Sequence, residues 1–195
     1  MAIKIIIEPA VEPVSLQECK DHLRIVHDDE DTLIESYAKA ARRYVEQVLC
    51  WRALITQELE LVLDSFQDQF KLPRPPLQEV TSIKYTDKDG TENTVDAGNY
   101  IVDTDSQPGR IVPAYGKSWP TDTLEPINAV RIRYKAGYGD NAEDVPQELR
   151  QAILILTAHF YEMREPVVVG QTVANVPWTV EALSLPYRAW GGDVE

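Results

Sequence analysis

Two cysteines and three histidines are the residues of this chain best suited to hold a metal ion. Cys19 and His22 lie about one helical turn apart, so they could share one face of a helix. The spacing from Cys19 through His22 to His27 matches no common zinc-binding pattern. In an antiparallel pair of helices, Cys50 would lie ~20 Å from Cys19, whereas zinc ligands lie about 2 Å from the metal. We therefore expect no metal site and two inert thiols in a reducing compartment.

A glycine-containing loop at 137–142 fits the loose dinucleotide-binding pattern G-x-G-x-x-G/A, with Gly137 and Gly139 as its first two glycines. In that motif the helix starts within the glycine run, but Pro146 places the start of the next helix later. Carboxylates in and after the loop would also repel phosphate: Asp140, Glu143 and Asp144. We interpret the loop as a connection that uses the backbone freedom of glycine.

No arrangement typical of acid, base or nucleophilic catalysis is found in the sequence. His159 adjoins the apolar stripe of a predicted helix, which favours a core or interface role. The run Asp87-x-Asp89-Gly90 could start a calcium loop, but the pattern around it predicts a hairpin turn instead. We predict no catalytic residue, cofactor-binding residue or metal ligand, and hence no enzyme. The alternative function is a small soluble enzyme or nucleotide-binding protein that uses the Gly137–Gly139 loop.

Three helices are predicted, at 14–50 and at 145–165. Ser15 and Glu18 form a capping box that starts the first helix, which should end near Arg24. A run of acids at 28–31 starts a long second helix, whose apolar residues repeat at helical spacing. The third helix follows Pro146.

Roughly six strands are predicted between the second and third helices, in a β-rich insert at 53–136. Leu59, Leu61 and Leu63 alternate with less apolar residues, which is the period of a half-buried strand. Further predicted strands lie at 80–86, 91–95, 100–103, 110–113 and 129–135. The fold class is therefore α+β, a helical bundle interrupted by an antiparallel β-rich insert. We expect one domain over 1–195, with a C-terminal tail at 166–195.

The charge of the chain limits its partners. Of 195 residues, 19 are Lys or Arg and 32 are Asp or Glu, which gives a net charge of −13. Tight binding to nucleic acid or to an anionic membrane needs clustered cations, and only the pairs Arg42–Arg43 and Arg131/Arg133 offer any. No apolar run approaches the ~20 residues of a membrane helix. The acidic excess is concentrated near the N-terminus, in Glu8, Glu12, Glu18, Asp21, Asp28, Asp29, Glu30, Asp31 and Glu35.

An ordered series of segments carries a family resemblance. It begins with EPVSLQECKDHLR (12–24), DDEDTLI (28–34) and AARRYVE (40–46). It continues with LPRPPL (72–77), VTSIKY (80–85) and DG (89–90). It ends with PGRI (108–111), YKAGYGD (134–140) and VPQELRQA (145–152). In this order they resemble the head-tail connector (adaptor, or head-completion) proteins of tailed bacteriophages and prophages.

The resemblance implies a structural subunit of the virion, made in the host bacterial cytoplasm and located at the head–tail junction. Copies would form a homo-oligomeric ring under the portal protein, extend the DNA channel and dock the tail-completion protein. DNA would pass without specific binding, and some of the N-terminal acid would face it. No cofactor and no membrane are implied. The resemblance makes Trp178, Tyr187 and Trp190 in the tail the candidate contacts with the portal.

Overall fold

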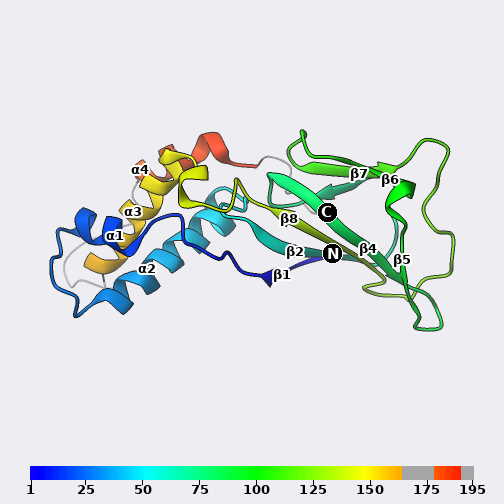
Figure 1. Cartoon of the computed structure of the whole chain (residues 1–195), viewed down its shortest axis with the longest axis horizontal. Helices are drawn as coiled ribbons and strands as arrows, with labels where there is room; N and C mark the ends of the chain where they lie inside the picture. Colours follow the sequence, from blue (N-terminus) through cyan, green and yellow to red (C-terminus); the bar gives the residue numbers. More distant parts are fainter. Residues whose placement is uncertain (164–177, 190–195) are drawn as a thin grey trace. The chain divides into compact units, whose positions relative to one another are not determined.

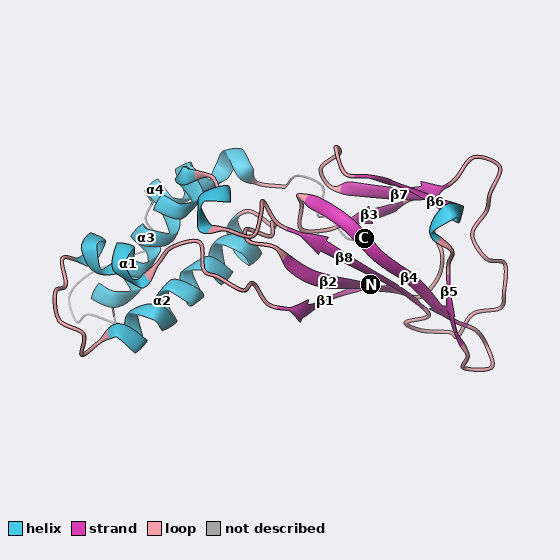
Figure 2. Ribbon diagram, viewed as in Figure 1, coloured by secondary structure: helices cyan, strands magenta, loops and turns pink. Residues whose placement is uncertain are grey.

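A computed structural model describes residues 1–163 and 178–189 of the chain. These residues divide into two compact units. The β unit comprises 1–10, 56–138 and Ala189, and the helical unit comprises 11–55, 139–163 and 178–188. Figure 2 shows the α-helices in one unit and the strands in the other, where a short 3-10 helix, Ala97–Asn99, also lies. The predicted α+β class is confirmed, while a single domain over the whole chain stays a prediction.

A five-stranded antiparallel sheet forms the larger part of the β unit (Figure 1). Its order is β1 (Ala2–Ile7), β2 (Gln57–Leu63), β8 (Val130–Ala136), β4 (Leu77–Thr86) and β5 (Glu92–Thr94). Burial alternates along β8, as expected of a strand with one face on the core. The β4–β5 hairpin confirms the predicted turn, because Gly90 has a φ of +80° there.

A second, three-stranded sheet completes this unit. It consists of β3 (Phe70–Leu72), β7 (Gly109–Pro113) and β6 (Tyr100–Asp103), in that order. An aromatic cluster lies beside it, in which Trp119 stacks on Phe66 with 5.5 Å between ring centroids and meets Phe70 edge-on at 5.1 Å. The cluster buries Trp119 and thereby anchors the long loop that precedes β8.

Two of the eight strands in the described residues were not predicted from the sequence. The first is β1, which lies outside the predicted insert and pairs with β2 from Ala2 opposite Val62. Its apolar run is cut at Glu8 and Pro9, and such a short run has no clear period of its own. The second, β3, has only three residues, too few for any alternation to be seen.

The helical unit is built on the three predicted helices. α1 (Leu16–Leu23) begins at the predicted capping box, with the Glu18 amide donating to Ser15 Oγ at 3.2 Å and the Ser15 amide donating to Glu18 at 2.8 Å. α2 (Asp31–Tyr44) continues as one π-helical segment, Val45–Leu49. α3 (Gln147–Glu162) follows Pro146 and buries its apolar stripe. Within 1–163 and 178–189, no helix combines the length and apolar character needed to cross a bilayer.

A fourth helix lies in the region predicted to be an irregular tail. α4 (Trp178–Ser184) packs on α3 and continues into a 3-10 turn, Leu185–Tyr187. Its seven residues are too few to show a period, and Pro186 follows close behind. Burial of Val180 and Ser184 against the bundle stabilises it.

Candidate functional site

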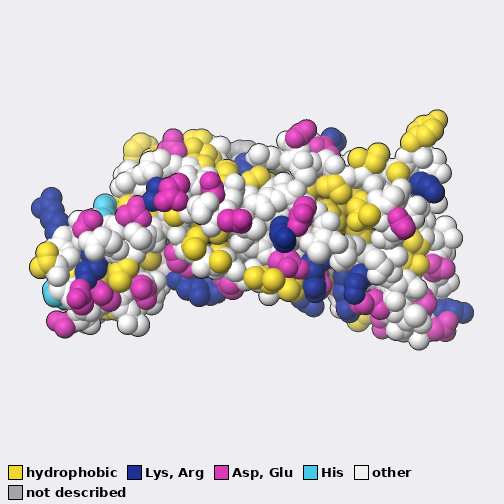
Figure 3. All heavy atoms as spheres, viewed as in Figure 1, with side chains coloured by type: hydrophobic (Ala, Val, Ile, Leu, Met, Phe, Trp, Pro, Cys, Tyr) yellow, Lys and Arg dark blue, Asp and Glu magenta, His cyan; other side chains and the backbone are white. Residues whose placement is uncertain are grey.

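The outward side of α4 and its 3-10 turn carries exposed apolar side chains. Trp178 is 79% exposed and Leu185 is 56% exposed, and Ala182 lies between them. Their i, i+4, i+7 spacing places all three on one side of the helix, opposite buried Val180 and Ser184. We call Trp178, Ala182 and Leu185 the α4 stripe. Figure 3 shows hydrophobic side chains at the surface of the helical unit in this region.

Several contacts hold α4 firmly on the bundle. The Cys50 thiol lies 3.5 Å from the Ser184 carbonyl oxygen, and Arg52 Nε donates to the Tyr187 carbonyl. The Tyr187 hydroxyl donates to Glu148 Oε2 at 2.8 Å. Because these contacts fix both the helix and the turn, the α4 stripe is presented to a partner at little cost in conformational entropy.

The three predicted docking residues lie in different surroundings. Trp178 is exposed at the start of α4, whereas Tyr187 is half-buried and its hydroxyl bonds to Glu148. Trp190 lies outside the described residues. Sequence reasoning missed Leu185 and Ala182, because α4 is too short for their spacing from Trp178 to be recognised as a helical period.

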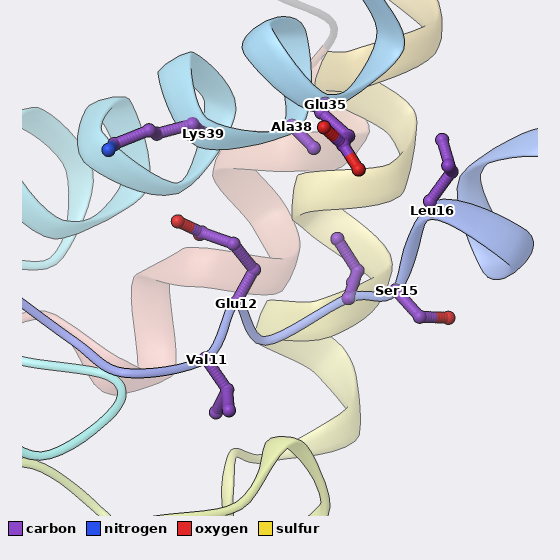
Figure 4. A pocket seen from close by; sticks show the side chains of 8 residues that line it. Val11, Glu12, Ser15, Leu16, Glu35, Ala38 and Lys39 are labelled. Atoms are coloured by element: carbon purple, nitrogen blue, oxygen red, sulfur yellow. The ribbon is translucent and has the colours of Figure 1, made fainter. Parts of the chain in front are cut away.

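A pocket of about 460 Å³ opens in the helical unit between the segment before α1 and the face of α2. Its lining residues are Val11, Glu12, Val14, Ser15, Leu16, Glu35, Ala38 and Lys39. Figure 4 shows Glu12 directed toward α2, while Glu35 and Lys39 leave α2 in opposite directions. Val14 and Ala38 are buried, so the wall is apolar and the rim is charged. Sequence patterns give no sign of this pocket, because its two sides come from separate segments.

A buried ionic network supports this pocket. Arg42 is 1% exposed, and it donates to Glu12 Oε2 from Nε at 2.6 Å and to Glu46 Oε2 from Nη1 at 2.7 Å. Glu46 Oε1 accepts the Leu54 amide at 3.0 Å. Burial alone would lower the pKa of Arg42, but the carboxylates of Glu46 and Glu12 raise it above its ordinary value. Arg42 therefore stays charged and fixes one side of the pocket.

The glycine loop is poorly arranged for nucleotides. Gly137 has a φ of +143°, and its amide donates to the Pro76 carbonyl at 3.0 Å. Beside Gly139 lies the carboxylate of Asp144, which accepts the Asn141 amide at 2.9 Å. A carboxylate at this place would repel a phosphate group.

The basic pairs are largely engaged in ion pairs. Arg42 is buried, so it cannot reach a nucleic-acid backbone. Arg133 lies 3.4 Å from Glu58 and 3.2 Å from Glu60, and Arg131 lies 3.9 Å from Glu92. These pairs reduce the positive charge available to phosphate.

The two cysteines and His159 are further residues whose side chains could do chemistry. Burial raises the pKa of Cys19 and of Cys50 to about 11, which keeps both thiols protonated near neutral pH. His159 is half-buried, with its ring centroid 6.2 Å from that of Phe160. Across the described parts of the chain, no three His, Cys, Asp or Glu residues gather so that they could hold a metal ion.

Comparisons with known proteins give a consistent result. A family model described as "Head completion protein" matches residues 12–189. A chain in the neck of an empty gene transfer agent (GTA) particle, computed with C6 symmetry, is 27% identical with a TM-score of 0.77. A chain in the virion of a native GTA particle is 28% identical with a TM-score of 0.79, and one in the neck of a native GTA particle with C12 symmetry is 28% identical with a TM-score of 0.78. Each likeness covers 97% of this chain and 96% of the other. A comparison with curated proteins found no match.

Proposed function

The chain belongs to the head completion protein family, and on this premise we propose that it is a structural head–tail connector (adaptor) subunit. Copies assemble into a ring under the portal protein, extend the DNA channel and dock the tail-completion protein at the head–tail junction of the virion. The observation that carries the proposal is the likeness over 97% of the chain to proteins in particle necks with C6 and C12 symmetry. The role needs no catalysis and no cofactor.

The α4 stripe is the proposed contact with the portal. Trp178 presents a large aromatic side chain on a fixed helix, which is typical of interface hot spots, and exposed Leu185 adds apolar area beside it. Tyr187 supports this surface from below through its bond to Glu148. Trp190, which follows closely in the sequence, extends the proposed contact.

The acidic N-terminal helices are proposed to face the channel. Asp21, Asp28 and Asp29 are exposed there, whereas Lys20 is buried and pairs with Asp28 at 2.5 Å and Asp31 at 2.8 Å. A wall of like charge repels phosphate, so DNA would pass without specific binding. This explains how a protein beside DNA can carry a net charge of −13.

Native mass spectrometry of the purified chain, alone and with its portal protein, tests the proposal. We expect a complex in which many copies of the chain join one portal assembly. A monomer without portal is compatible, because the ring can form on the portal alone. A chain that stays monomeric and never associates with the portal would contradict the proposed function.

A further inference from the structure

The pocket between the segment before α1 and α2 selects for a particular kind of occupant. Its wall includes buried Val14 and Ala38, and its charged lining residues are Glu12, Glu35 and Lys39, of which Lys39 points away from Glu35 (Figure 4). Glu12 already bonds to Arg42, whereas Glu35 is exposed on α2. A volume of about 460 Å³ accommodates a large side chain. The Glu35 side of the pocket, away from Lys39, therefore fits an apolar or aromatic group that has a cation close by.

A loop of the β unit has this composition. Tyr115 is 102% exposed, as much as in an extended peptide, and Lys117 is exposed two residues later. Gly116 between them has a φ of +72°, and the Lys117 amide donates to the Ala114 carbonyl at 2.9 Å, which closes a tight turn.

Both ends of this loop are fixed. The Ala114 amide donates to the Asn99 carbonyl at 2.9 Å, and Trp119 after the turn is buried in the aromatic cluster. A fully exposed aromatic ring leaves a large apolar surface in water. Because the turn that carries it is anchored, binding would cost little conformational entropy.

We propose that the 114–118 loop of one copy inserts into this pocket of the next copy. The Tyr115 ring packs on Val14 and Ala38, and the Lys117 ammonium pairs with Glu35. This inference rests on the proposed ring and names one of the contacts that builds it. A contact between two different surfaces of the same chain is heterologous, and repeated around an axis it closes into a ring. The complementary charges of Lys117 and Glu35 are what favour a second copy as the occupant.

Site-directed cross-linking with a short bismaleimide tests the contact directly. The native thiols do not interfere, because Cys19 is 1% and Cys50 0% exposed. Copies carrying both Ser118→Cys and Val11→Cys, which keep Tyr115, Lys117 and Glu35, should form a ladder of multimers on the portal. A mixture of the two single variants should stop at dimers, since each copy then has one reactive partner. The matched control pairs Ser118→Cys with Ala40→Cys, at an exposed position on another side of α2, and should give no ladder.

A charge exchange provides the second test. Glu35→Lys and Lys117→Glu should each lower ring assembly on the portal at least tenfold, and the double variant should recover most of it. Both side chains are exposed, so thermal unfolding should be unchanged in all three variants. If the cysteine variants form rings on the portal without cross-links, and the double charge variant recovers no assembly, this contact is wrong but the proposed function stands. Absence of any ring on the portal would overturn both.

Discussion

For Arg42, the sequence predicts the helical position but not the environment of the side chain. Its place in a run of helical spacing was predictable, but its burial between Glu12 and Glu46 was not, because Glu12 lies 30 residues away. The Ser15–Glu18 cap was predictable in full, since all of its atoms come from four consecutive residues. Local hydrogen bonds leave a signature in the sequence, whereas long-range ion pairs do not.

Replacing Arg42 with alanine should strongly destabilise the helical unit. The change leaves Glu46, which is 1% exposed, without its guanidinium partner. Breaking a buried ion pair in this way costs about 3–5 kcal/mol. Urea unfolding should show this loss, with exposed Lys39→Ala as the control. A loss below about 1 kcal/mol would mean that water or another group satisfies Glu46.

Protonation of Glu18 should lower the free energy of unfolding at acidic pH. Burial alone would raise its pKa, but hydrogen bonds from Ser15 and the charge and hydrogen bond of Arg150 hold it below the ordinary value of 4.5. A carboxylate with a depressed pKa contributes stability above its unfolded pKa, and this is lost as pH falls through the folded pKa. Thermal unfolding from pH 6 downward should therefore show a decline, beginning near pH 4.5, that is smaller in Glu18→Gln. Identical pH profiles for the two proteins would contradict this role of Glu18.

At the scale of elements, length decides what could be predicted. α1, α2, α3 and most strands were found because their periods run over enough residues, and β6 was placed at its observed bounds. β1, β3 and α4 were missed because each is short or lacks a period, and tertiary contacts stabilise them. The α4 stripe was therefore only partly anticipated, through Trp178.

Polar substitution of the α4 stripe should separate binding from folding. The double variant Trp178→Ser/Leu185→Ser removes exposed apolar groups, so its unfolding free energy should change by no more than about 0.5 kcal/mol. Its affinity for the portal should fall at least about tenfold, as expected of hot-spot residues. Thr179→Ala, at an exposed neighbouring position, serves as the matched control. Unchanged portal affinity in the double variant would place the contact elsewhere.

At the scale of the whole molecule, the chain combines two units that offer separate surfaces. The helical unit carries the α4 stripe and the pocket, and the β unit carries the 114–118 loop. A ring subunit needs different surfaces for its two neighbours and for the portal, and the pocket, the 114–118 loop and the α4 stripe are the surfaces that we propose for them. Sequence patterns predicted the family and the two kinds of structure. They did not predict the pocket or its proposed partner loop, which depend on how distant segments meet.

The acidic N-terminal helices should line the DNA channel if the ring forms as proposed. Reversing exposed charges there, for example Asp21→Lys with Asp29→Lys, should make assembled rings retain DNA in low salt, and higher salt should release it. The same double exchange at Asp68 and Asp89 in the β unit is the control. Equal DNA retention by both variants would place these carboxylates away from the channel.

Cryo-electron microscopy of the chain bound to its portal protein tests the central claim most directly. We predict a closed ring of copies under the portal, coaxial with it, with an open channel along the axis. Copies attached singly around the portal without contact to one another, or no density beneath the portal at all, would contradict the account.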